Sequence, residues 1–488
     1  MWELFLTVAT LGLFWFITYM KGSELGSASV IALGVLTMCI VYPRGGFYVI
    51  ILLIFLESYI GVINQVVTIA DIFDEVGIYP VMQAAYFYIL FPAVIFTIIL
   101  GYLISRRISN PAAFGMLTTE YIMLVPPLLC LTFAPISFAL QYPTLSIIAD
   151  CMFGLFFIAG IIFGRVFFPI RGMFYILLNY VCIANHVIGF GFLFYVLNTG
   201  LIFRNTLFVV WAGRYLMGQT DFNMFLVPIL FAVIIWRGKE LSRGWRLFYG
   251  FSFWAFFLRL IFSLFRGPIA ATLFALVIIY FLAKAEQRFE IRRYAVRMVA
   301  AIVLAVFLFL IVVPHGRMVL QELFVKRFTA IFAQDTEEGN LSLQIRSVEN
   351  AKIWEEIRAF PLFGYGPGAE VEFRFSDKAN TEKRSFFHNG YLWLWHKFGI
   401  LGPISMILFL LTPFYRGLQL RRKKLTPDES AFLAGVMAST VCIFPAIVTN
   451  SIIARPQGLL MLILCFTFLL TIERRVFRDE GLDINPYL

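Results

Sequence analysis

The sequence predicts an all-α, polytopic helical membrane protein with about fourteen transmembrane helices, twelve to fourteen in all, and one large helical loop. Of its 488 residues, 61% are hydrophobic and only 14% are charged, whereas soluble domains carry about 25% charged residues. Apolar runs of about 20 residues, the length that crosses a bilayer, recur along the chain. A single long polar segment, which begins after residue 314, interrupts them.

The spans expected from hydropathy cover most of the chain. In order they are 4–20, 26–42, 47–63, 81–105, 114–133, 147–167, 173–197, 221–236, 247–262, 268–283, 298–314, 391–413, 431–450 and 458–472. Several of them are short or contain Gly and Pro, so we expect some helices to be kinked or merged.

The first span has no basic residue ahead of it and no small-residue cleavage site behind it, which favours a retained helix over a removable signal peptide. The cysteines lie within or beside expected spans and form no CxxC pair, so buried, inert thiols are expected rather than disulfides or a thiolate metal site. They are Cys39, Cys130, Cys151, Cys182, Cys442 and Cys465.

Basic residues indicate the orientation, because they concentrate in cytoplasmic loops. A cytoplasmic N-terminus places the basic clusters at 237–246, 284–297 and 421–424 in the cytoplasm. It leaves few basic residues in the short outer loops, Arg204 and Arg214 among them. Both termini are then inside and the long loop is outside. The net charge of +10 is explained by the anionic inner leaflet, so a nucleic-acid partner is not expected.

The chain shows no convincing internal repeat and no Ser/Gly-rich linker. We therefore expect one integrated membrane domain divided by topology into residues 1–314, the outer loop 315–390 that carries the active-site lid, and residues 391–488.

The outer loop itself contains helical and turn signals. Residues 318–332 and 341–360 have helical character, and Asn340 or Ser342 is available as the N-cap of the second helix. Pro361 ends that helix. The glycines that follow, at 364, 366 and 368, predict a tight backbone that approaches another segment closely.

Three arginines are hard to explain as packing. Arg259 and Arg266 lie seven residues apart at an outer turn, so they share one side if the helix continues between them. Ionisable residues near hydrocarbon usually face a cavity or a partner, although Arg266 could also extend to the lipid headgroups. Arg346, on the second loop helix, is either a solvated surface charge or part of a site.

His388 and Asn389 stand where the loop returns to the membrane, after the Gly-rich turn. With the outer arginines they suggest an anion site beside a titratable group, and arginine suits diphosphate because its planar fork donates two parallel hydrogen bonds. A lone histidine is otherwise structural, which is how we interpret His186, His315 and His396. No HExxH, DxD or GxxxxGKS motif supports a metal or nucleotide cofactor.

These motifs are similar to those of a known family. The sequence contains Ser263-Leu-Phe-Arg266-Gly267, similar to a Ser-Arg-Gly signature with two residues inserted. Arg346 precedes Pro361-Leu-Phe-Gly-Tyr-Gly-Pro-Gly368, and His388-Asn389-Gly390-Tyr391-Leu392 precedes Gly399-Ile-Leu-Gly402. Over 259–402 the chain resembles the bacterial O-antigen ligase and O-antigen polymerase superfamily, which are multi-spanning glycosyltransferases of the GT-C type.

The resemblance implies a glycan donor linked to undecaprenyl diphosphate, handled at the periplasmic face of the bacterial inner membrane without a cofactor. It implies that Arg266 and Arg346 grip the diphosphate, and that His388 acts as general base or orienting group, with inversion at the anomeric carbon. Arg259 replaces Arg266 if the register is shifted. Arg259, Arg214 and Asn389 are the candidate substrate-binding residues.

Three functions remain open from the sequence. The number of expected spans favours a polymerase of O-antigen, capsule or exopolysaccharide, with a chain-length regulator and a flippase as candidate partners. A ligase that transfers finished glycan to lipid A core is the alternative within the family. A flippase for lipid-linked oligosaccharides is the alternative from another class, although transporters often show two related halves and this chain shows none.

Overall fold

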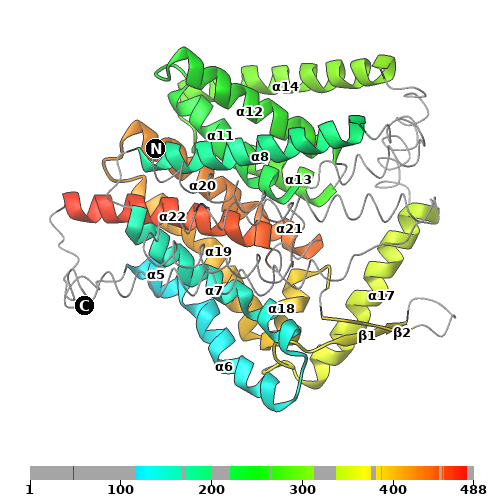
Figure 1. Cartoon of the computed structure of the whole chain (residues 1–488). Helices are drawn as coiled ribbons and strands as arrows, with labels where there is room; N and C mark the ends of the chain where they lie inside the picture. The colour runs from blue at the N-terminus through cyan, green and yellow to red at the C-terminus, as the bar shows by residue number, and fades with distance from the viewer. Residues whose placement is uncertain are drawn as a thin grey trace, which may run out of the picture. The chain divides into compact units, whose positions relative to one another are not determined.

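The structure is a computed structural model, and it describes residues 48, 117–167, 172–198, 220–263, 266–312, 337–374, 381–385, 387–449, 453 and 456–480. Helices dominate this part of the chain, together with one two-stranded hairpin (Figure 1). The chain forms two compact units, one of residues 1–184 with 459–488 and the other of residues 185–458. The predicted spans 4–20, 26–42, 47–63 and 81–105, apart from Tyr48, and the predicted helix 318–332 lie outside the described residues.

The first unit is built from apolar helices that pack closely. They are α5 (Thr118–Met123), α6 (Val125–Ala139), α7 (Thr144–Phe167), the first part of α8 (Met173–Asn198) and most of α22 (Pro456–Asp479). Gly164 on α7 faces Leu470 on α22, and a Cβ at position 164 would lie 2.8 Å from the Leu470 side chain. Small residues let membrane helices approach this closely.

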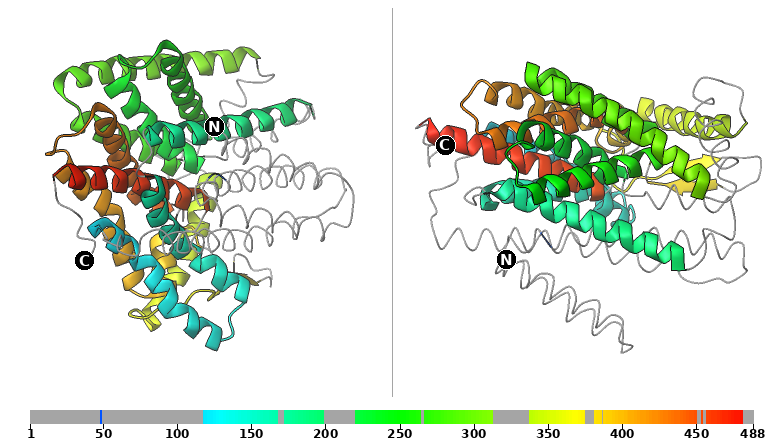
Figure 2. Two further views of the ribbon diagram at one scale, coloured as in Figure 1. Left: turned by 60° about the vertical axis from the view of Figure 1, so that its left-hand side comes forward. Right: turned by 90° about the horizontal axis from the view of Figure 1, so that it is seen from above.

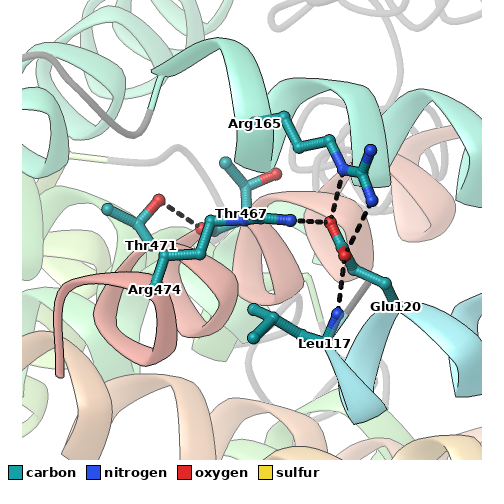
Figure 3. A network of polar contacts seen from close by, with 6 residues as sticks. All are labelled: Leu117, Glu120, Arg165, Thr467, Thr471 and Arg474. Atoms are coloured by element: carbon teal, nitrogen blue, oxygen red, sulfur yellow. Dashed lines mark hydrogen bonds and ion pairs between the residues drawn. The ribbon is translucent and has the colours of Figure 1, made fainter. Parts of the chain in front are cut away.

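A buried ion cluster joins three helices of the first unit (Figure 3). Glu120 on α5 accepts hydrogen bonds from Arg165 Nε at 2.8 Å and from Arg474 Nη2 at 2.5 Å. Its second oxygen accepts from Arg165 Nη2 at 3.0 Å and from the Leu117 amide at 2.9 Å. The Glu120 side chain has no solvent exposure, so the two guanidinium groups replace the water that a carboxylate requires.

The second unit is organised around α11 (Thr220–Arg237), in which every residue from Thr220 to Ile234 is buried. It packs against α12 (Arg243–Phe262), α13 (Arg266–Leu282) and α20 (Pro427–Val441). The contact with α20 is close, because a Cβ at Gly435 would lie 2.8 Å from the Ile229 Cα. The unit also contains α14 (Ala285–Val312), a single long helix in Figure 2, and α19 (Leu401–Leu420) and α21 (Ile443–Thr449).

The polar segment of the second unit holds α17 (Glu337–Ala359), β1 (Val371–Arg374) and β2 (Thr381–Arg384), and it continues into α18 (Gly390–Phe398), the first part of the expected span 391–413. The two strands pair antiparallel, with Val371 opposite Arg384 and Arg374 opposite Thr381. Contacts from α17 reach both β1 and α18, and α18 leads directly to α19. The polar segment is therefore a small folded region that leads through α18 into the apolar helix α19 (Figure 1).

Five helical stretches in the described residues are long and apolar enough to cross a membrane, by length and composition. They are Thr118–Ala139, Ser146–Arg165, Thr220–Arg237, Leu401–Leu420 and Pro427–Val448. A multi-pass, predominantly helical protein is thus supported. The total of twelve to fourteen spans and the division at residues 314 and 390 remain predictions.

Several details differ from the sequence prediction. The expected span 391–413 is two helices, because Gly399 adopts φ +61° between α18 and α19. Neither Asn340 nor Ser342 is an N-cap, since α17 already begins at Glu337. The hairpin was not predicted. Of the described cysteines, four are buried and Cys151 is partly so, as expected for buried thiols.

Candidate active site

The Gly-rich turn docks its backbone on the end of α18. The amide of Tyr365 donates to the His396 carbonyl at 2.8 Å, and the amide of Gly366 donates to the Lys397 carbonyl at 2.9 Å. Gly364, Gly366 and Gly368 have φ values of +64°, +93° and +82°, a region that residues with a Cβ rarely enter. The predicted tight turn is therefore confirmed, and α18 is the segment that it approaches.

Two glycines make this approach possible. A Cβ at Gly364 would lie 2.6 Å from the Gly399 nitrogen, and a Cβ at Gly399 would overlap the Leu362 carbonyl. The Ile400 amide also donates to the Pro361 carbonyl at 3.1 Å. Backbone atoms therefore hold the turn and the α18–α19 junction directly against each other.

The side chain of His396, on α18, contacts the Gly-rich turn and the end of α17. His396 Nε2 lies 3.0 Å from Glu356 Oε2, and its ring stacks on Tyr365 at 4.8 Å between centroids. The Tyr365 hydroxyl donates to the Glu356 carbonyl at 3.2 Å, while the fully buried Lys397 donates to the Ala369 carbonyl. These contacts agree with the interpretation of His396 as structural.

Asn389 starts α18. Its side-chain oxygen accepts hydrogen bonds from the amides of Tyr391 at 3.1 Å and Leu392 at 3.2 Å, which is N-cap geometry. The cap fixes the backbone directly after His388, and the fully buried Phe387 fixes it directly before. The structure thus gives Asn389 a local structural task, and its predicted contact with substrate remains a prediction.

His388 pairs with a buried carboxylate. Its Nδ1 lies 2.7 Å from Oε2 of Glu349 on α17, and the side chains are 39% and 0% exposed, respectively. Because a carboxylate only accepts hydrogen bonds, this contact assigns the proton of the neutral imidazole to Nδ1. The lone pair is then on Nε2, on a side chain that solvent reaches.

Glu349 was not among the predicted site residues. Its other oxygen, Oε1, is buried and has no hydrogen-bond partner among the residues that the structure describes. A carboxylate on the face of α17 that carries Arg346 was the available signal, since residues three apart are neighbours on a helix. The sequence could not show that His388, 39 residues further on, returns to this face.

Arg346 lies three residues before Glu349 on α17 and is partly exposed. It therefore lies one helical turn from the carboxylate that contacts His388, and its role in catalysis remains a prediction. Lys352, the next basic residue on this helix, has a carboxylate on the same helix as its partner. Its hydrogen bond to Glu355, at 3.0 Å, raises the pKa of the Lys352 ammonium.

The other predicted arginines are Arg266, Arg214 and Arg259. Arg266 is the first residue of α13, and its side chain is outside the described part; Arg214 lies outside the described residues altogether. Arg259 donates to the Asn185 carbonyl at 3.1 Å, and its guanidinium carbon lies 5.7 Å from the Phe190 ring centroid. The helix does not continue between Arg259 and Arg266, because α12 ends at Phe262.

Elsewhere in this unit His186 contacts Ser252 at 2.9 Å and is surrounded by phenylalanine rings, as expected of a structural histidine. In the described part of the chain no group of three or more His, Cys, Asp or Glu side chains is arranged to hold a metal ion.

Comparison with known families identifies the part of the chain that contains this site. Residues 251–410 match the family model described as O-antigen ligase (Wzy_C). The resemblance is confirmed. The matched segment includes Arg259, Arg266, Arg346 and the His388-Asn389 pair, but not Arg214. No curated protein matches the chain by sequence. The family match supports a membrane enzyme that transfers glycosyl groups and handles lipid-linked glycans.

Proposed function

We propose that this protein is a polysaccharide polymerase at the periplasmic face of the bacterial inner membrane, with a cytoplasmic N-terminus and C-terminus. The donor is a glycan on undecaprenyl diphosphate, and the acceptor is a second lipid-linked repeat unit. The observation that carries the proposal is the contact between His388 and the buried Glu349, one helical turn from Arg346, inside the segment that matches the family.

The proposed reaction is a single inverting displacement. The acceptor hydroxyl oxygen attacks the anomeric carbon, and the bond from that carbon to the phosphate oxygen breaks. The hydroxyl proton passes to Nε2 of His388, and undecaprenyl diphosphate leaves with the bonding electrons. General-base catalysis of this kind contributes about 10²- to 10⁴-fold in rate.

Glu349 is a positioning residue in this proposal. It holds Nδ1–H of His388, so that Nε2 faces the acceptor, and its negative charge stabilises the imidazolium that forms. The fully buried carboxylate is a costly arrangement in apolar surroundings. A buried carboxylate that contacts a partly exposed imidazole suits proton transfer, because the other ring nitrogen can remain open to a substrate.

Arg346, with Arg266, neutralises the charge that builds up on the leaving diphosphate. Guanidinium groups suit this task, because they bind phosphate oxygens through two parallel hydrogen bonds. Fixed cations that face developing charge lower the barrier without reorganisation during the reaction. Arg259, already in an aromatic and carbonyl environment, is the proposed further contact to the donor, together with Arg214.

The family name favours a second candidate, a ligase that moves glycan to lipid A core. One experiment separates the two. Purified protein in lipid is incubated with lipid-linked repeat units alone, and the products are resolved by length. Longer lipid-linked chains support the polymerase; transfer only after addition of rough lipopolysaccharide establishes the ligase instead. Translocation of the glycan without any new glycosidic bond would establish a flippase and refute both.

A further inference from the structure

The Gly-rich turn exposes three large apolar side chains. Phe360, Leu362 and Phe363, which we call the apolar tip, are 57%, 62% and 71% exposed, respectively. They lie between the end of α17 and Gly364, in a segment whose backbone is fixed by hydrogen bonds. Contiguous exposed apolar groups on a rigid segment usually mark a contact surface.

The apolar tip lies beside the start of a helix that is long and apolar enough to cross a membrane. The Pro361 carbonyl, inside the tip, accepts a hydrogen bond from the Ile400 amide, and the Leu362 carbonyl lies against Gly399. Leu401, directly after Ile400, begins α19, a helix long and apolar enough to cross the bilayer. A membrane-spanning α19 would place the tip at the level where this helix enters the hydrocarbon, on either face of the membrane.

The helix that follows continues the same apolar surface. Exposed apolar residues on α19 recur at intervals of three and four, which places them on one helix face. They are Leu401, Ile404, Leu408, Leu411, Tyr415 and Leu418, and the exposed Ile407 lies beside them. On a membrane-spanning helix such a stripe faces lipid, and its first member, Leu401, follows directly after the residues that hold the tip.

The residues beside the tip are those that favour the interface between membrane and water. The Trp395 indole donates to the Pro361 carbonyl at 2.8 Å, and its ring meets Trp354 edge-on at 5.2 Å. Arg358 places its guanidinium carbon 5.9 Å from the Trp354 ring centroid. Tryptophan rings concentrate at headgroup level, and arginine extends to it.

We propose that the apolar tip inserts into the acyl region of the adjoining leaflet, with Trp354, Trp395 and Arg358 at headgroup level. The occupant of this surface is bulk lipid. Insertion anchors the C-terminal end of α17 and so limits the distance between the polar segment and the bilayer surface. The proposal rests on exposure and backbone contacts, so it does not depend on the proposed glycosyl transfer.

The test measures depth in the full-length protein in phosphatidylcholine nanodiscs. Phe363→Cys and, separately, Leu362→Cys receive a nitroxide label, and unsubstituted protein controls for labelling of native cysteines. Collision with oxygen and with a water-soluble nickel chelate gives the depth of each label. The matched control is Glu355→Cys on α17, where the native side chain is 72% exposed.

Labels at 362 and 363 are expected roughly 5–10 Å below headgroup level, the depth typical of interfacial elements, with high access to oxygen and low access to nickel. The label at 355 is expected to favour nickel. Nickel access at 362 and 363 equal to that at 355 would overturn the proposal. Protection from both reagents would also overturn it, because the tip would then be covered by protein.

Discussion

Glu120 in the first unit and Glu349 in the second are both fully buried carboxylates, but their partners differ. Glu120 accepts from two guanidinium groups and one amide, and these contacts use both of its oxygens. Glu349 binds one imidazole through one oxygen, and that imidazole is partly exposed. Glu120 is therefore paired with two guanidinium groups that stay charged, whereas Glu349 contacts an imidazole, a group whose charge can change.

This difference separates a structural use of buried charge from a chemical one. A guanidinium keeps its proton at any physiological pH, so the Glu120 cluster cannot transfer protons and can only hold α5, α7 and α22 together. An imidazole can gain and lose a proton near neutral pH. The contrast predicts that removing Glu120 damages folding, while removing the Glu349 pair damages turnover.

The largest effect on turnover is expected for His388→Ala. Loss of the proposed base should lower glycan transfer by about 10²- to 10⁴-fold, together with a fall in unfolding temperature, because the fully buried Glu349 carboxylate loses the imidazole that it contacts. Initial rates of lipid-linked chain extension and a thermal unfolding scan on the same preparation measure both quantities. Wild-type turnover by this variant would remove His388 from the mechanism.

The largest effect on stability is expected for Glu120→Ala. It leaves Arg165 and Arg474 buried without their carboxylate, which typically costs about 3–5 kcal/mol. Denaturant unfolding of the protein in detergent measures the loss. The matched control is Glu290→Ala, which removes a more exposed pair with Arg293 at 3.4 Å and should cost under about 1 kcal/mol. Equal losses for the two variants would contradict the structural role of the cluster.

Glu349→Gln is expected to lower kcat by about 10- to 100-fold, the loss typical of outer-shell partners that orient a histidine. The amide can still contact His388 but lacks the charge that stabilises an imidazolium. KM for the lipid-linked substrate should stay close to wild type, since Glu349 contacts His388 and has no contact with the donor in the proposed mechanism. A rise in KM with unchanged kcat would instead indicate a role in binding.

Arg346→Lys sharpens the comparison between fixed and titratable charge within the second unit. It retains the positive charge but loses the planar fork that binds two phosphate oxygens. Transfer should fall by about tenfold, as for loss of a single charge-assisted hydrogen bond of about 1.5 kcal/mol. Rates with donors of equal glycan length measure it, and Arg358→Lys on the same helix serves as the control that should remain unchanged.

A local loss of stability, without direct loss of a proposed catalytic group, is expected for Gly399→Ala. The substitution forces an alanine into φ +61°, which alone costs of order 1–3 kcal/mol, and also against the Leu362 carbonyl. Gly244→Ala is the matched control, because nothing lies within 4 Å of a Cβ there. Unfolding temperatures of the two variants test the difference; an unchanged value for Gly399→Ala would show that the turn can relax.

The sequence by itself determined the features that depend on local order. Apolar runs predicted multiple spans, the glycines after Pro361 predicted a tight turn, and His388 with Arg346 indicated the site region. These signals are short in range, because hydropathy and backbone restrictions act over a few residues. The hairpin was not predicted, because strands of four residues are too short to show a clear alternation of apolar and polar residues.

Tertiary structure alone decided which charges meet. Glu349 and His388 are 39 residues apart, Glu120 and Arg165 are 45 apart, and Glu120 and Arg474 are 354 apart. Helical spacing relates residues three or four apart and carries no information about such pairs. The split of span 391–413 at Gly399 also required the structure, because the Gly-rich turn occupies the space that a continuous helix would need.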